Sequence, residues 1–233
     1  MKSAILFGGG GGIGARIAKE LKNDGYGVII ADVVESKKDI GDFFVTCDAT
    51  NEIDVKRAVL FAQDKFGSID VAMNCQGMYL VEPLETTEIH SFQKIIDVNL
   101  KSAFIVCKAV IPVMKWQKRG YLISIASMSG LRGKRGHAAY CASKFALVGL
   151  TLAISDELKG TNVRISAVCP SSVDTGMLHK AVSLDEKELS RILKPEDVAG
   201  VVMGLIHTNE RIRQTIVPIE IENDIDKLKR KKI

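Results

Sequence analysis

No long apolar run occurs in the 233-residue chain. Its apolar stretches are short, as at 28–31, whereas a membrane-spanning helix needs about 20 consecutive apolar residues. The N-terminus passes from Met1, Lys2 and Ser3 directly into a strand-like run, without the apolar segment and cleavage site of a signal peptide. We therefore expect a cytoplasmic protein that does not contact membranes.

Cysteine pairs at metal-binding spacing are absent as well. No two cysteines form a Cys-x-x-Cys motif, so the sequence predicts neither a metal site nor a disulfide framework. Free, mostly buried thiols in a reducing cytosol are the expected state. The five cysteines lie 28 to 34 residues apart, at Cys47, Cys75, Cys107, Cys141 and Cys169.

The body of the chain carries almost no excess charge. The formal net charge is +4, but five basic residues and no acid lie within the last seven positions, so the remainder sums to −1. Binding to nucleic acid requires a basic face, which this composition does not indicate. We expect the basic tail over 224–233 to be frayed and solvated.

Strand-like and helix-like segments alternate along the chain, whose 46% hydrophobic and 26% charged residues are typical of a globular protein. The strand-like segments are continuously apolar, which indicates parallel strands with helices on both faces. We predict one Rossmann-type, doubly wound α/β domain over 1–233, with a seven-stranded parallel sheet. The expected strands are 3–7, 27–31, 43–47, 70–74, 121–126, 163–169 and 214–221, and the expected helices are 13–22, 52–66, 89–116 with a kink at Pro112, 138–158 and 196–206.

A run of glycines separates the first strand from the first helix. Glycines at this point allow the backbone to turn sharply and to approach a pyrophosphate, which the N-terminus of the helix attracts. Two registers fit: Gly9, Gly11 and Gly14 match G-x-G-x-x-G, while Gly8, Gly12 and Gly14 match G-x-x-x-G-x-G. The alternative is a flexible turn without a ligand.

Asp32 ends the second expected strand, 18 residues beyond Gly14. An acid at this place accepts hydrogen bonds from the adenosine ribose of a dinucleotide. It also repels a 2′-phosphate, since two unit charges about 4 Å apart repel by roughly 1 kcal/mol in water and about 4 kcal/mol at an effective dielectric of 20. Asp32 therefore favours NAD over NADP, unless it is only a solvated acid at a strand end.

Tyr140 and Lys144 are four residues apart and share one face of an expected helix. A nearby ammonium stabilises a phenolate and so lowers the pKa of a tyrosine toward the range useful for proton transfer. The pair alone could be an ordinary amphipathic face. Ser127 and two polar segments, 74–77 and 170–175, follow expected strands, however, and the carboxyl ends of parallel strands form the ligand-binding edge.

In this order and spacing, the motifs resemble those of the short-chain dehydrogenase/reductase family, in its compact single-domain branch. The resemblance extends from Ser3 to about Ile221 and places Gly8, Gly12 and Gly14 around the pyrophosphate. The cofactor-binding residues that it implies are Gly8, Gly10, Gly11, Gly12, Ile13, Gly14, Asp32, Asp48, Ala49, Asn74, Gly77, Tyr140, Lys144, Val173 and Thr175.

The resemblance also implies a catalytic tetrad for hydride transfer between nicotinamide and a carbonyl carbon: Asn99, Ser127, Tyr140 and Lys144. In such a site Tyr140 gives or takes the hydroxyl proton, and Ser127 hydrogen-bonds the same substrate oxygen. Lys144 binds the nicotinamide ribose and lowers the pKa of Tyr140. Asn99 would hold a water in a proton relay.

Five positions depart from the family pattern. Phe7 replaces a threonine, Cys75 and Gln76 replace Asn-Ala, Ala126 replaces a serine, and Ser171 replaces a glycine. Since no tetrad member is lost, we expect these changes to affect loop geometry rather than chemistry. Gln76 and Ser171 could alter the substrate pocket.

The predicted function is NAD-dependent interconversion of a secondary alcohol and a ketone. The alternatives are a 3-oxoacyl-acyl carrier protein reductase, many of which use NADP, and a non-catalytic dinucleotide-binding redox sensor, which would not need Tyr140. The segment 176–193, where the family sets substrate specificity, contains no motif.

Two further features leave alternatives open. A basic cluster precedes Tyr140 and could capture an anionic substrate group or form a solvated or subunit-contact loop; its members are Arg132, Lys134, Arg135 and His137. The segment 138–158 is apolar on more than one face, which a single sheet cannot cover. We therefore expect a homodimer or homotetramer that pairs 89–116 and 138–158 with their counterparts.

Overall fold

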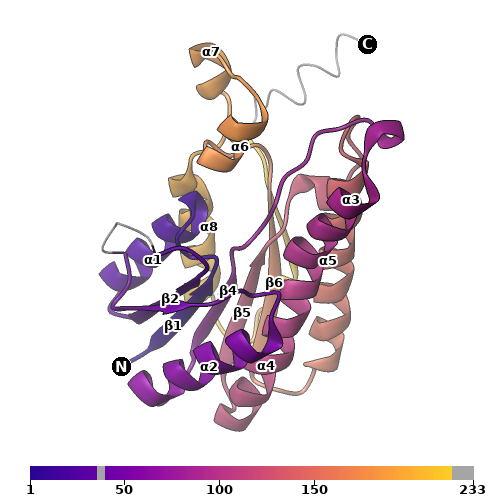
Figure 1. Ribbon diagram of the computed structural model, residues 1–233. Helices are drawn as coiled ribbons and strands as arrows, with labels where there is room; N and C mark the ends of the chain where they lie inside the picture. The colour runs from indigo at the N-terminus through magenta and orange to yellow at the C-terminus, as the bar shows by residue number, and fades with distance from the viewer. Residues whose placement is uncertain (36–39, 222–233) are drawn as a thin grey trace.

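The computed structural model describes residues 1–35 and 40–221, whose strands form one parallel sheet (Figure 1). The strand order is β3-β2-β1-β4-β5-β6-β7, and each neighbouring pair is parallel. This confirms the predicted doubly wound α/β fold and its seven strands. The strands are β1 Ser3–Phe7, β2 Gly27–Asp32, β3 Phe43–Thr46, β4 Val71–Asn74, β5 Gly120–Ile125, β6 Val163–Pro170 and β7 Ile216–Ile219.

Helices cover both faces of the sheet (Figure 1). α1 and α8 pack against one face, while α2, α4 and α5 pack against the other. The helices are α1 Gly12–Asn23, α2 Glu52–Phe66, α3 Ile89–Ile96, α4 Ser102–Gln117, α5 Ala138–Glu157, α6 Gly176–Ala181, α7 Glu186–Leu189 and α8 Pro195–His207. Short helical turns are η1 Leu84–Thr86, η2 Asp97–Lys101 and η3 Met128–Gly130.

The apolar strands supply two cores, one on each face of the sheet. Along β1, Leu6 faces the core beneath α1 and α8, whereas Ile5 and Phe7 face the core beneath α2 and α4. All three side chains are fully buried, and burial of one such side chain contributes about 1.5–3 kcal/mol. A strand covered on both faces must therefore be apolar at every position, which explains the pattern in the sequence.

The expected helix 89–116 is not a regular α-helix, and this prediction was wrong in detail. α3 passes through a π-helical turn, η2, before α4 begins at Ser102. Pro112 lies inside α4, which continues to Gln117. A π turn inserts one residue into the helical repeat and so changes which side chains face inward.

The segment 176–193 contains two short helices that the sequence did not predict. α6 and α7 stand above the carboxyl edge of the sheet (Figure 1). Thr175 caps the N-terminus of α6: its hydroxyl accepts a hydrogen bond from the Leu178 N–H. The basic tail 224–233 lies outside the described residues.

One helix in the described part of the chain, α5, is long and apolar enough to cross a membrane by length and composition. Half of its most apolar 18-residue window is buried inside the fold. Its inner face packs on the sheet and carries Tyr140 and Lys144. Because core helices of globular proteins pass the same test, α5 is weak evidence for a membrane span.

Candidate active site and cofactor cleft

A cleft opens at the carboxyl ends of β4, β5 and β6, with a volume of about 800 Å³ that includes space open to solvent. It lies beneath α6, whose Met177 and Leu178 form part of its wall. Seven residues predicted from the sequence line this one cleft: Ile13, Gly77, Ser127, Tyr140, Lys144, Val173 and Thr175. The sheet edge therefore gathers residues that are up to 162 positions apart in the chain.

Tyr140 and Lys144 occupy successive turns of α5 and point into the cleft. The Lys144 Nζ atom lies 5.8 Å from the centroid of the Tyr140 ring and donates a hydrogen bond of 3.0 Å to the Ile125 carbonyl. The Ser127 side chain lies close enough to the Tyr140 phenol to lower its pKa. Three of the four predicted tetrad residues are thus brought together at the end of β5.

The Ser127 loop approaches α5 closely because residue 130 is a glycine. A Cβ atom at Gly130 would lie 2.6 Å from the Lys144 carbonyl oxygen, too close for any side chain. Ser127 itself caps η3, where its Oγ accepts a hydrogen bond of 3.1 Å from the Ser129 N–H. This cap fixes the orientation of the Ser127 hydroxyl beside the Tyr140 phenol.

Burial determines the titration of both groups. Burial raises the pKa of the Tyr140 phenol above its ordinary value, and the Ser127 side chain offsets only part of this effect. We expected Lys144 to lower the pKa of Tyr140; in the protein alone desolvation outweighs any such effect. Burial also lowers the pKa of Lys144 from 10.5 to about 8, although the nearby Cys169 and Cys75 act in the opposite direction.

The two cysteines beside Lys144 remain thiols at neutral pH. Burial raises the pKa of Cys75 to about 12 and that of Cys169 to about 11. All five cysteines are free in the structure.

Asn99, the fourth predicted tetrad member, lies in η2 behind the cleft and is 2% exposed. Its side-chain amide donates hydrogen bonds of 2.9 Å to the Met78 carbonyl and to Ser143 Oγ, and its oxygen accepts one of 2.6 Å from the Met78 N–H. Asn99 therefore ties the loop after β4 to α5. Its role in a water relay stays a prediction.

The glycine loop has the geometry required by one of its two registers. Gly8 has a φ of +69°, and a Cβ there would lie 2.4 Å from the Gln76 backbone nitrogen. A Cβ at Gly14 would lie 2.9 Å from the Gly8 carbonyl oxygen, whereas one at Gly11 would meet only an atom at 3.8 Å. Gly14 is common to both registers. Gly8 is obligatory whereas Gly11 is not, which favours G-x-x-x-G-x-G over the register through Gly11.

Asp32, at the end of β2, contacts the glycine loop. Its carboxylate accepts hydrogen bonds of 2.9 Å from the Gly10 N–H and 2.8 Å from the Val33 N–H. Asp48 is exposed and accepts hydrogen bonds from Thr50, and Ala49 is buried beside it. These residues lie along the loop end of the sheet, outside the cleft walls described above; their contacts with a cofactor stay predictions.

Asn74 lies below the cleft floor, at the end of β4. Its amide donates a hydrogen bond of 3.0 Å to Ser124 Oγ on β5, and its oxygen accepts one of 3.3 Å from Gln76 Nε2. Gln76 also donates to Ser102 Oγ at 2.8 Å, so this unusual residue links the loop to α4. The side chain of Asn74 thus supports the floor, and its cofactor contact stays a prediction.

Val173 and Thr175 lie between β6 and α6. Val173 forms a parallel bridge with Leu193, and the Thr175 hydroxyl donates to the Val173 carbonyl at 3.4 Å. A Cβ at Gly12 would lie 3.0 Å from Thr175 Cγ2, so this segment packs directly on the glycine loop. The start of α6 and the start of α1 therefore enclose one end of the cleft.

The chain matches a known protein family along most of its length. The model of the short chain dehydrogenase family matches residues 2–186. The chain belongs to this family. Human 3-hydroxyacyl-CoA dehydrogenase type-2 is 32% identical to this short-chain dehydrogenase over 232 residues, covering 87% of this chain and 88% of the human protein.

Solved structures agree with this assignment. A 3-ketoacyl-(acyl-carrier-protein) reductase from Brucella melitensis, complexed with NADH, has 27% identity and a TM-score of 0.86, covering 96% of this chain and 98% of that one. ElxO with NADP bound has 26% identity and a TM-score of 0.85, covering 94% of this chain and 97% of that one. The chain is therefore an NAD(P)-dependent oxidoreductase, and its neighbours do not decide between the two dinucleotides.

The residues present fit a dinucleotide. Among the described residues no side chain caps the start of α1, and its first turn contains no acid, so its N–H groups can receive a phosphate. Residues 8–12 and 14 are glycines, so no side chain covers the backbone at these positions. Ser171 Oγ and Gln76 Oε1 are buried, belong to residues that line the cleft and find no hydrogen-bond partner within the described part of the chain. Such atoms are expected where a bound group completes a site.

Two features of the cleft wall were not recognised in the sequence. Tyr79 lines the cleft and bonds to the buried His137, although neither its residue type nor its position signals a contact across 58 residues. Within the basic cluster, Arg132 forms an ion pair of 2.9 Å with Glu220, and Lys134 lines the cleft. The cluster is therefore divided between structural and cleft-facing residues.

Replacement of Lys144 should expose the energetic cost of its burial. A basic group whose pKa is lower in the folded than in the unfolded protein destabilises the fold most at a pH below the folded-state pKa. This destabilisation is lost as the pH rises toward the pKa of the unfolded state. Between pH 7 and pH 9.5, the free energy of unfolding of the wild type should therefore rise by about 2 kcal/mol relative to Lys144→Met. Urea unfolding of the cofactor-free proteins measures this difference. Lys115→Met, on the exposed face of α4, is the control. If the free energies of unfolding of the wild type and Lys144→Met differ by the same amount at both pH values, Lys144 does not carry a buried charge.

Proposed function

We propose that this short-chain dehydrogenase interconverts a secondary alcohol and a ketone with NAD, with Tyr140 as general acid and base. The observation that carries the proposal is the group formed at the cleft by the buried Tyr140 and Lys144 and the half-buried Ser127. A bound nicotinamide dinucleotide supplies the hydride donor or acceptor. Glycines 8–14 would hold its pyrophosphate, and Asp32 its adenosine ribose.

Each side chain has one task in this proposal. During oxidation Tyr140 removes the hydroxyl proton of the alcohol as the hydride leaves the same carbon; during reduction it returns the proton to the oxygen. Ser127 holds that oxygen by a second hydrogen bond. Lys144 would bind the nicotinamide ribose, and its positive charge would stabilise the phenolate form of Tyr140. Asn99 holds the loop that carries Gly77 against α5.

A 3-oxoacyl thioester is a second candidate substrate. The names of the human relative and of the Brucella melitensis structure both refer to acyl substrates of this class. Met128, Met177 and Leu178 give the cleft an apolar wall that suits an acyl chain, and Lys134 could meet a phosphate of the carrier. A redox-sensing role is set aside, because the family and relatives make the chain an oxidoreductase.

Tyr140→Phe should remove the proton donor and leave the shape of the cleft unchanged. Turnover should fall by about 10²- to 10⁴-fold, because general acid–base catalysis contributes on this scale. NAD affinity, measured by fluorescence titration, should stay close to that of the wild type. Tyr121→Phe is the matched control, since Tyr121 is buried on β5 and bonded to Ser166 away from the cleft. More than about a tenth of the activity remaining in Tyr140→Phe would refute the assignment.

Asp32→Ala should weaken discrimination against NADP. The carboxylate that receives the Gly10 N–H would repel a 2′-phosphate, so its removal should lower the ratio of kcat/KM for NAD to that for NADP by about tenfold or more. Asp64→Ala, at an exposed acid on α2, is the control. A wild type that prefers NADP, or an unchanged ratio in the variant, would contradict the NAD assignment.

We also propose that the protein forms a homodimer or homotetramer through α4 and α5. The outer face of α5 is an uncharged apolar stripe with Ala142, Phe145, Gly149 and Leu152 exposed, and Phe104 on α4 is 53% exposed. Because burial of this stripe would also hold Tyr140 and Lys144 in place, assembly supports the site. The free thiols agree with a cytoplasmic location.

Leu152→Glu should prevent this assembly by placing a charge in the stripe. Light scattering at micromolar concentration should give a multiple of 25.4 kDa for the wild type and a smaller mass for the variant. Leu60→Glu, on the exposed face of α2, is the control, because Leu60 is 65% exposed and lies outside the stripe. A wild-type monomer with full activity would refute the interface.

A further inference from the structure

Ser171 follows β6 at the carboxyl edge of the sheet, in a place where the family pattern has a glycine. Its backbone N–H donates a hydrogen bond of 2.8 Å to the Ile219 carbonyl oxygen on β7, which fixes the main chain at this point. Its side-chain oxygen is buried and has no hydrogen-bond partner within residues 1–35 and 40–221. A hydroxyl in this state has lost its hydrogen bonds to water and gained none from the protein, which destabilises the fold. A glycine would avoid this loss, so we expect the hydroxyl to serve a ligand.

The register of the sheet brings Ser171 next to the reacting groups. Ile125 on β5 pairs with Val168 on β6, and neighbouring strands lie about 4.8 Å apart. The backbone of Ser127, two residues beyond Ile125, is still extended, with a φ of −173° and a ψ of 157°. Ser127 therefore lies near the level of Pro170, which Ser171 directly follows. Both serines line the cleft.

Residues 171–175 form a wall that runs from the glycine loop toward the reacting groups. The Leu193 N–H donates a hydrogen bond of 2.9 Å to the Ser172 carbonyl and so holds the wall in place. At the far end of the wall, the Thr175 side chain packs against Gly12. A dinucleotide whose pyrophosphate lies on the glycine loop would therefore extend along this wall.

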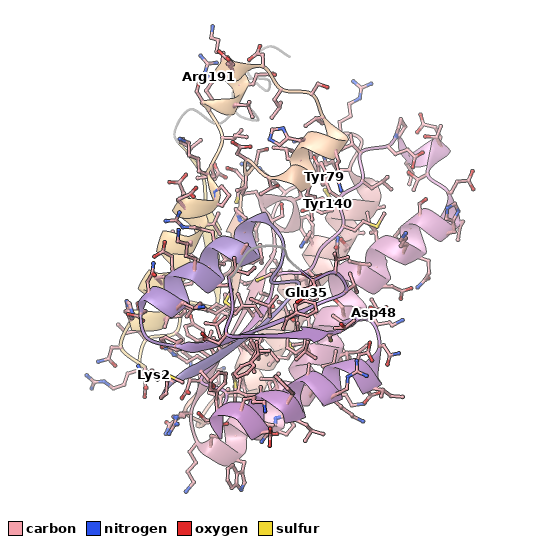
Figure 2. All side chains as sticks on the ribbon, turned by 60° about the vertical axis from the view of Figure 1, so that its left-hand side comes forward. Lys2, Glu35, Asp48, Tyr79, Tyr140 and Arg191 are labelled. Atoms are coloured by element: carbon pink, nitrogen blue, oxygen red, sulfur yellow. The ribbon has the colours of Figure 1, made fainter. Side chains whose placement is uncertain are left out.

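A nicotinamide ring that exchanges hydride with a carbon beside Tyr140 must lie at the same end of the cleft as Ser171. Figure 2 shows Tyr140 beneath α6, the helix that follows the wall, and far from Lys2. In the proposed mechanism the substrate oxygen already has two hydroxyl partners, from Tyr140 and Ser127. The carboxamide of the ring presents an acceptor and a donor next to the reactive C4 atom, and it needs a partner of its own. A serine hydroxyl both donates and accepts, and rotation about its one side-chain bond turns it from the wall toward the ring.

We propose that the Ser171 hydroxyl binds the carboxamide of the nicotinamide ring and so holds the ring beside the reacting carbon. A glycine at this place does not make that contact. A ring held by its carboxamide does not turn over about its bond to the ribose, so a single face of C4 meets the substrate. This inference rests on the proposed hydride transfer at Tyr140.

Binding of NADH and of ADP-ribose tests the proposal, because ADP-ribose lacks only the nicotinamide ring. In calorimetric titrations Ser171→Ala should bind NADH about fivefold more weakly than the wild type does, since one hydrogen bond contributes on this scale. ADP-ribose should bind equally to both proteins. Ser155→Ala is the matched control, because Ser155 is also a half-buried serine but bonds to Thr215 outside the cleft. It should bind both ligands as the wild type does.

A purely structural role of Ser171 would disturb the wall where it packs on the glycine loop, and so would weaken the binding of both ligands. Equal weakening of NADH and ADP-ribose, or unchanged NADH binding in Ser171→Ala, would overturn the proposal. The titrations contain no substrate, so their result does not depend on alcohol–ketone turnover. Selective loss of NADH binding in Ser171→Ala, together with a wild type that converts no alcohol or ketone, would support the Ser171 contact and contradict the proposed function.

Discussion

The buried ammonium of Lys144 is the constraint on which the site depends. It lies at the ends of β4, β5 and β6, where the Ile125 carbonyl accepts its hydrogen bond and the Cys75 and Cys169 thiols lie nearby. Desolvation lowers its pKa to about 8, so the fold holds a charge that it does not solvate well. Because water screens it little, the ammonium interacts strongly with the Tyr140 phenol and with any ribose that binds beside it.

Two close backbone approaches and one side-chain contact fix the surroundings of Lys144. Gly130 lets the Ser127 loop touch the carbonyl of Lys144, Gly8 lets the first loop touch the Gln76 backbone, and the η2 turn aims Asn99 at Met78. Each approach joins a loop at the carboxyl edge of the sheet to a helix or to another loop. Together they hold the reacting groups through contacts to the main chain, which surface substitutions do not easily disturb.

The sheet, its parallel strands and the residues at its carboxyl edge could be predicted, because continuous apolar strands and the Tyr140–Lys144 spacing are local patterns. The π turn at Asp97–Lys101 has no local signal, since its sequence fits a regular helix equally well. The bond between Tyr79 and His137 depends on tertiary packing of two loops. The raised pKa of Tyr140 likewise follows from burial, which the i, i+4 spacing alone does not reveal.

Transfer of label from cofactor to substrate tests the central claim most directly. The wild type would be incubated with NADH deuterated at nicotinamide C4, on either face in turn, and with a panel of ketones. The account predicts that one of the two labelled forms gives a product alcohol with deuterium on the carbinol carbon, detected by mass spectrometry. Binding of NADH without label in any product, for either face, would contradict hydride transfer at this site.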